Sequence, residues 1–179
     1  MKRLAMLTMI LTSLFAINFT AQAQMEMPKP AAELKQFDVF AGSWVIDVDM
    51  KPGPMGPGGK MTETEHCDWM DGSYYLVCHS DFKSSMFNGS STSYYGYDAN
   101  DKVYTYNAFS SMGEAENAKG TLDGNTWSWM SESKMGGQTT KNRFILKVLS
   151  PTSYSFTFDG SQDGKTWNTV MDGKGTKQK

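Results

Sequence analysis

Apolar and polar residues alternate in about ten short segments that begin after Gly42-Ser43. In the first segment, for example, Trp44, Ile46 and Val48 occupy every second position. This period of two predicts β-strands with one buried and one solvated face. The segments are joined by short turns, which force neighbouring strands to be antiparallel. They could form a sandwich, but closure removes exposed edges. We therefore predict an all-β fold, an antiparallel up-and-down β-barrel of about ten strands.

The chain divides into three predicted regions. Residues 1–23 combine two basic residues, an apolar stretch and Ala21-Gln22-Ala23, which is typical of a secretory signal peptide cleaved near Ala23. An uncleaved anchor is the alternative, but the stretch is shorter than the roughly 20 residues that a spanning helix needs. Residues 24–32 predict a flexible lead-in, and 33–179 a single barrel domain with a short N-terminal helix. We expect the mature protein to be periplasmic or secreted.

One predicted hairpin holds both cysteines and both histidines. In an antiparallel hairpin, the residue numbers of every directly opposed pair add up to the same value. A loop at 71–74 sets that value at 145. Cys67 then faces Cys78 on one side of the sheet, and His66 faces His79 on the other. In an exported protein this arrangement predicts a disulfide. Two buried free thiols are the alternative.

Metal handling is a further alternative. The sulfurs and the imidazoles point to opposite faces, which suits a zinc site poorly because zinc needs converging ligands. His66 and His79, with Asp68 or Asp81, remain weak candidate ligands for copper or zinc. The 14 methionines also raise copper handling, since thioethers bind Cu(I). We predict no cofactor.

Composition and motifs argue against several function classes. The formal net charge of -2 and the absence of a basic patch argue against a nucleic-acid partner. After the predicted signal peptide no apolar segment is long enough to span a membrane. The sequence has no G-x-S-x-G motif and no Ser-His-Asp set. Glu63/Glu65 and Glu114/Glu116 each share a strand face, which we expect to be solvent-exposed. We predict a non-enzymatic protein, and the sequence leaves its oligomeric state open.

Aromatic residues are too numerous to lie all on the outside. A barrel of this size either fills its interior or keeps a cavity for one ligand. We predict that the interior binds a small hydrophobic or aromatic molecule. The alternative is a structural or protein-interaction module of the cell envelope with a filled core. The candidate pocket residues are Trp44, Trp69, Tyr95, Tyr97, Tyr106, Trp127, Trp129, Phe156 and Phe158.

Several segments resemble, in order, the DUF1579 family of small bacterial domains of unknown function. They are Phe37–Trp44 (FDVFAGSW), Met70–Val77 (MDGSYYLV), Tyr95–Asp98 (YGYD) and Gly120–Asp123 (GTLD). The resemblance spans about residues 34–179 and implies a calycin-like barrel related to lipocalins and fatty-acid-binding proteins. It also implies that Trp44 stacks near Lys177 at one end, where the family pattern has Arg. It brings no catalytic residue and no ligand. Calycin-like haem barrels use a late His, which this chain lacks.

Overall fold

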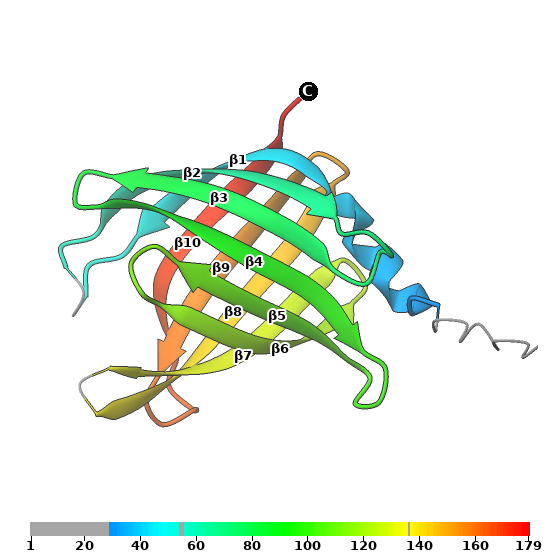
Figure 1. The fold of residues 1–179 in the computed structure, drawn as a ribbon. Coiled ribbons are helices and arrows are strands. Elements are labelled where there is room, and N and C mark those ends of the chain that lie inside the picture. Colours follow the sequence, from blue (N-terminus) through cyan, green and yellow to red (C-terminus); the bar gives the residue numbers. More distant parts are fainter. Residues whose placement is uncertain (1–28, 54–55, 136) are drawn as a thin grey trace, which may run out of the picture.

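The protein is a closed ten-stranded antiparallel barrel preceded by one short helix, as predicted (Figure 1). The computed structural model describes residues 29–179 except 54–55 and 136, so the predicted signal peptide lies outside the described residues. In the described part of the chain, no helix has the length and apolar character needed to cross a membrane.

Strands of eight to thirteen residues follow the helix along the chain. The elements are η1 (Ala32–Val39), β1 (Gly42–Met50), β2 (Gly59–Trp69), β3 (Leu76–Ser84), β4 (Asn88–Asp98), β5 (Val103–Ser110), β6 (Ala115–Asp123), β7 (Thr126–Met135), β8 (Gln138–Ser150), β9 (Ser153–Ser161) and β10 (Asn168–Lys177). Each strand pairs with its neighbours in sequence, and β1 pairs with β10 to close the barrel. Closure pairs both edges of every described strand.

The β2–β3 hairpin has the predicted register. Cys67 pairs with Cys78 and His66 with His79, and a backbone hydrogen bond from Met70 N to the carbonyl oxygen of Tyr75 closes the turn. The two sulfurs form a disulfide, which confirms the prediction and excludes the free-thiol alternative. The disulfide ties the hairpin together deep in the wall, where both cysteines are fully buried.

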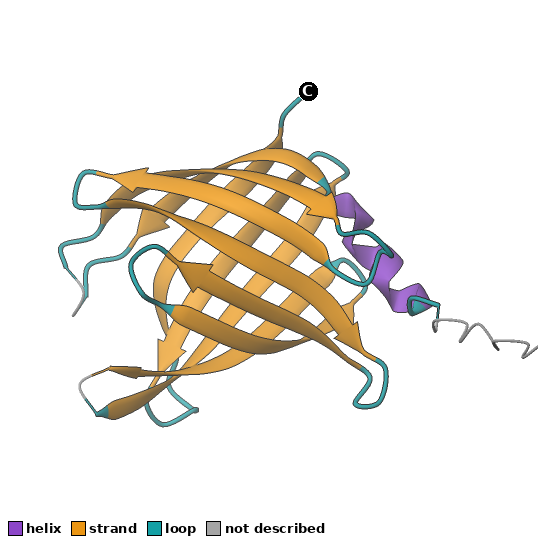
Figure 2. Cartoon of the chain, in the orientation of Figure 1, coloured by secondary structure: helices purple, strands orange, loops and turns teal. Residues whose placement is uncertain are grey.

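The helix covers one end of the barrel (Figure 2). It is a 3-10 helix whose Leu34 and Phe37 are buried. Its polar side is held by the strands: Trp69 Nε1 donates to Asp38 Oδ1 at 3.0 Å, and Lys177 Nζ donates to the carbonyl oxygen of Val39 at 3.2 Å. Gly42, at a φ of 102°, then turns the chain into β1, a conformation that favours glycine.

Aromatic rings fill the barrel beneath this helix. Phe37 enters from the helix and stacks on Trp127, with ring centroids 4.8 Å apart. Trp127 in turn stacks on Trp129 at 5.7 Å, and Tyr104 meets Trp127 edge-on at 4.7 Å. Trp127 is only 1% exposed and Phe37 is fully buried. This end of the interior is therefore a packed aromatic core with no room for a ligand.

Farther from the helix along the barrel, inward glycines make room for rings on the adjacent strand. Gly175 pairs with Tyr154, and a Cβ at Gly175 would collide with the Tyr154 ring. Gly120 lies in the same way beneath the ring of Trp129. The rings consequently lie along the wall instead of projecting to the barrel axis.

Candidate binding site inside the barrel

The barrel interior has two halves with different side chains. The aromatic half lies next to η1, where β1, β3, β5, β7 and β9 begin and the other strands end. The acidic half lies toward the opposite end, which is bordered by the other set of hairpin loops (Figure 2). Besides apolar residues, its inward positions include three carboxylic acids and several small polar residues, among them Glu63, Glu65, Glu116, Ser80, Ser93, Ser131 and Asn142.

Glu63, Glu65 and Glu116 point into the barrel, contrary to the expectation of a solvated strand face. Side chains alternate along a strand, so Glu63 and Glu65 share the face of the fully buried Cys67. Glu116 similarly shares the inward face of buried Ala118. Glu114, by contrast, precedes β6 and is exposed.

Hydroxyl groups of neighbouring strands satisfy these carboxyl groups only in part. Ser80 Oγ on β3 donates to Glu65 Oε1 at 3.3 Å. Ser131 Oγ on β7 donates to Glu116 Oε1 at 2.8 Å. A carboxyl group has two oxygens and can accept about four hydrogen bonds, so each acid keeps free capacity toward the interior.

Burial changes the ionisation of the three acids. It raises the pKa of Glu65 to about 8, and the charge of nearby Glu63 adds to the effect, against a smaller opposing effect of the Ser80 hydrogen bond. Burial likewise raises the pKa of Glu63 and of Glu116. At neutral pH Glu65 therefore holds a proton for most of the time. A carboxyl group in this state can donate a hydrogen bond or a proton as well as accept.

Three tyrosines lie among these acids. Burial raises the pKa of Tyr95, Tyr106 and Tyr154, and the charges of Glu63 and Glu65 contribute at each of the three phenols. For Tyr106 on β5, the charge of Glu116 on the adjacent β6 is the largest effect after burial, followed by the charges of Glu65 and Glu63. All three phenols remain neutral across the physiological range and offer uncharged hydroxyl groups.

The hydroxyl of Tyr154 indicates space that water can reach. Within the described residues, every fully buried side-chain nitrogen or oxygen has a hydrogen-bond partner. Tyr154 is only 5% exposed, yet its hydroxyl has no hydrogen-bond partner among the described residues. The hydroxyl must therefore border an accessible space. Half-buried Glu65, Tyr106 and Phe144 also point inward and keep accessible surface.

The nine predicted pocket residues fall into two groups. Four contribute to the packed core or rim of the aromatic half, namely Trp44, Trp69, Tyr97 and Trp127. Five lie at mid-depth or in the acidic half, namely Tyr95, Tyr106, Trp129, Phe156 and Phe158. The structure adds Tyr154 and Phe144, both of which point inward on strands that the sequence predicts.

The end contact implied by the resemblance is present in this geometry. Lys177 pairs with Trp44 across β10 and β1, and its Nζ lies 5.3 Å from the centre of the indole ring. Trp44 Nε1 donates to the carbonyl oxygen of Phe40 at 2.8 Å. These contacts close the helix end of the barrel.

The two histidines lie on the outer face and are exposed. His66 Nδ1 lies 2.8 Å from Ser43 Oγ, and its Nε2 lies 2.9 Å from Asp68 Oδ2. His79 Nδ1 lies 3.1 Å from Thr92 Oγ1. In the described part of the chain, the ligand-type residues that converge within 4.8 Å are Glu65, Cys67 and Cys78. Both sulfurs of that group are in the disulfide, so it offers no thiolate.

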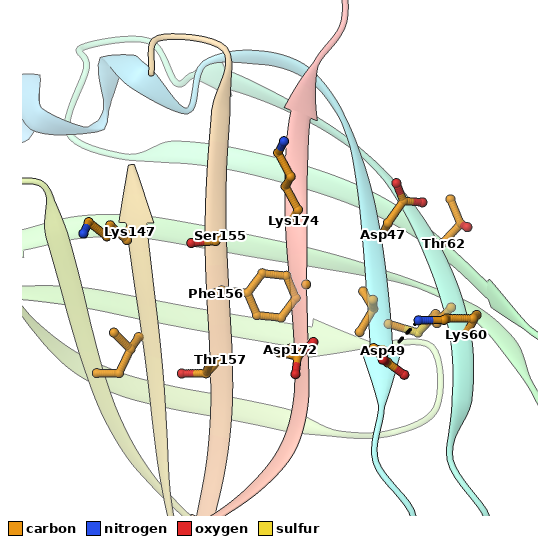
Figure 3. Close-up of a pocket in the computed structure, with 14 residues that line it drawn as sticks. Asp47, Asp49, Lys60, Thr62, Lys147, Ser155, Phe156, Thr157, Asp172 and Lys174 are labelled. Atoms are coloured by element: carbon orange, nitrogen blue, oxygen red, sulfur yellow. Dashed lines mark ion pairs between the residues drawn. The ribbon is translucent and has the colours of Figure 1, made fainter. Parts of the chain in front are cut away.

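A groove of about 810 Å³ lies on the outside of the barrel (Figure 3). Asp47 and Asp49 alternate with buried Val48, so they project outward into the groove. Lys60 Nζ pairs with Asp49 at 3.0 Å, and Lys51 pairs with Asp172 at 2.7 Å. The charges of this surface neutralise one another, which leaves little preference for a charged ligand. The interior is the stronger candidate site.

Fold and interior together define a single-chain antiparallel β-barrel, closed by a helix at one end, with an inward-facing acidic surface. A family model described as "Protein of unknown function (DUF1579)" matches residues 29–177, and the chain belongs to this family.

Two solved structures share the barrel fold. One is the crystal structure of Rv2717c from M. tuberculosis, with a TM-score of 0.59 at 11% identity over 84% of this chain and 100% of that one. The other is the S-type phycobiliprotein lyase CPES from Guillardia theta, with a TM-score of 0.51 at 9% identity over 81% and 92%. No curated protein matches the sequence.

Proposed function

We propose that this protein binds a small hydrophobic or aromatic molecule in the acidic half of its barrel. The unpartnered hydroxyl of Tyr154 is the observation that carries the proposal. It belongs to a side chain that is almost fully buried in a closed barrel, and it makes no hydrogen bond with the described residues. Barrels of similar strand number can hold one small ligand in their interior.

The walls of this half suit a molecule with an apolar body and a polar group. Phe144 and Phe156 stack with ring centroids 5.0 Å apart and offer an apolar surface. Glu65 and Tyr106 supply hydrogen-bonding groups on the facing walls. A few polar groups in a mainly apolar pocket fix the orientation of a ligand. The helix end is packed, so the ligand enters from the opposite end.

The protein is proposed to act outside the cytoplasm. A disulfide is compatible with an exported protein, because such bonds persist in oxidising compartments. The predicted signal peptide lies outside the described residues.

Calorimetric titration with tryptophol, 1-octanol and octanoate tests the proposal. We expect at least one to bind with one site per chain. Ala108, opposite inward Ser93, is the position to block. The Ala108→Phe variant should reduce the affinity at least tenfold because its ring projects into the acidic half. The matched control is Ala115→Phe, at an exposed position, which should bind normally.

Two outcomes would contradict binding in the interior. One is the absence of binding by all three probes and by the charged analogues used below. The other is binding that Ala108→Phe leaves unchanged in a variant with native near-ultraviolet circular dichroism. A filled structural core would then be the better description.

A further inference from the structure

The charges that face the interior are almost all negative. In the ten described strands, alternation places the Lys and Arg side chains outside, with Lys177 as the exception. Lys177 lies at the helix end and is engaged with Val39 and Trp44. The acidic half therefore has three carboxylic acids and no basic side chain from the described strands.

The hydroxyl of Tyr154 is directed toward the same acids. Its ring lies over Gly175, which pairs with Ile46 on β1, and Ile46 pairs with Glu63 on β2. The hydroxyl thus extends along this row toward Glu63 and Glu65, whose charges both raise its pKa. It is a nearly fully buried, unpartnered polar group aimed at the carboxyl groups. This observation is separate from the charge of the three acids.

The spacing of the acids does not suit a metal ion. Among the described residues, the ligand atoms that converge within 4.8 Å are those of Glu65 and the two disulfide sulfurs, and neither Glu63 nor Glu116 joins them. Glu63 and Glu65 are neighbours on β2, whereas Glu116 lies on β6 beyond Tyr106. Dispersed carboxyl groups with aromatic rings between them fit an organic cation, which gains from both charge and π-faces.

We propose that the acidic half recognises the ammonium group of a small aromatic or apolar amine, held between Glu63 and Glu65 on one wall and Glu116 on the other. Tyr154 and Tyr106 accept hydrogen bonds from the ammonium group, and Phe144 and Phe156 contact the apolar body. This inference rests on the proposed function and adds the charge of the ligand to it.

Binding of the cation releases a proton. Without ligand, Glu65 is mostly protonated at neutral pH because burial raises its pKa to about 8. An ammonium group beside it favours the carboxylate, so the carboxyl proton passes to the buffer while the amine stays charged. The titratable groups that face Glu65 are Glu63 on its own strand and Tyr95, Tyr106 and Tyr154 on β4, β5 and β9. The three phenols stay neutral throughout.

Three indole compounds of similar size test the ligand charge. They are tryptamine, tryptophol and indole-3-acetate, which carry a positive, a neutral and a negative group at neutral pH. We expect tryptamine to bind at least tenfold more tightly than tryptophol, and indole-3-acetate to bind most weakly. Titration in buffers of different ionisation enthalpy should show about one proton released per tryptamine. Release of about one proton changes the affinity about tenfold per pH unit, so between pH 6 and pH 8 the affinity for tryptamine should rise by well over tenfold.

Matched variants locate the effect. Glu65→Gln keeps the shape of the side chain but removes the ionisable group, so it should abolish the proton release and the preference for tryptamine. Glu114→Gln is the same change at an exposed site and should leave both unchanged. Circular dichroism of each variant checks the fold.

The results separate this inference from the proposed function. Tryptophol binding that Ala108→Phe blocks, without tighter binding of tryptamine, overturns the cation inference and leaves the interior site in place. A tryptamine preference that Glu65→Gln does not change also overturns it. Calcium binding that Glu65→Gln abolishes, with no tryptamine binding, would replace the amine by a metal. Failure of every indole compound overturns the cation inference, and the proposed function is overturned as well when 1-octanol and octanoate also fail to bind.

Discussion

The aromatic half and the acidic half of the barrel are built from the same ten strands but differ in what their inward positions hold. In the aromatic half, Phe37, Trp44 and Trp127 are at most 1% exposed and their rings are in contact with other rings. In the acidic half, Glu63 and Glu65 point inward and keep accessible surface. Strand alternation therefore decides which side chains point inward, whereas access for water decides whether those side chains must be apolar.

The helix accounts for this difference. It inserts the fully buried Phe37 among the rings, which excludes water from this end, and it is held to the strands by the contacts of Asp38 and Val39. Hairpin loops border the opposite end within the described residues (Figure 1). A polar group is costly to bury without partners but is tolerated where water reaches it. The carboxylic acids are accordingly at the end away from the helix.

The largest effect should come from removing a ring of the aromatic half. Trp127→Ala deletes a fully packed side chain, and such deletions cost about 3–5 kcal/mol of unfolding free energy. The same truncation at half-buried Phe158 should cost at least about 1 kcal/mol less, since water already approaches it. Chemical denaturation followed by circular dichroism measures both losses.

Equal losses for the two variants would show that the interior is packed uniformly. The distinction between the halves would then fail, and with it the argument for an accessible site near the acids.

The sequence predicts the scaffold well because its signals are local. The alternation at Trp44, Ile46 and Val48 identifies an inward face, and turn residues separate the strands. The sum shared by Cys67–Cys78 and His66–His79 predicts the hairpin register without any tertiary information.

Glu63, Glu65 and Glu116 point inward although their polarity alone predicts a solvent-exposed strand face. The predicted register of the β2–β3 hairpin is enough to place two of these acids inside. Glu65 and Glu63 are two and four residues before Cys67, so a buried disulfide places both carboxyl groups inside. Glu116 has no such marker and required the tertiary structure. The sequence does not predict the division of the interior into two halves, because Phe37 belongs to a helix whose packing depends on rings far away in the sequence, such as Tyr95 and Trp127.

A smaller effect should follow from adding one methyl group at each of two inward glycines, one beneath the Tyr154 ring and one toward the end away from the helix. Gly175→Ala places a Cβ against the Tyr154 ring, and overpacking of this kind costs about 1–3 kcal/mol. Gly160→Ala, toward the other end of the same sheet, meets only Val170 and Thr140 carbons at 3.5 and 3.6 Å. That variant should change the unfolding free energy by less than about 0.5 kcal/mol. Thermal unfolding of the two variants makes the comparison, and a Gly160→Ala loss as large as that of Gly175→Ala would show that both ends are tightly packed.

The smallest effect concerns the pH dependence of stability. The folded protein binds the Glu65 proton more tightly than the unfolded chain does, because burial raises the pKa from 4.5 to about 8. Its contribution is complete below about pH 4.5 and is lost as the pH rises toward 8, so stability should fall across this range. Glu65→Gln should flatten the fall without abolishing it, since the pKa values of Glu63 and Glu116 are also raised. Water near the carboxyl group screens its charge, so the effect is modest. We expect Glu65→Gln to raise the unfolding free energy by about 1 kcal/mol, or Tm by about 2–4 °C, at pH 8.5 and to change it very little at pH 4. Calorimetric scans of Glu65→Gln and of the exposed control Glu114→Gln at both pH values measure it. A gain at pH 4 as large as that at pH 8.5 would mean that the Glu65 proton has no part in the stability of the acidic half.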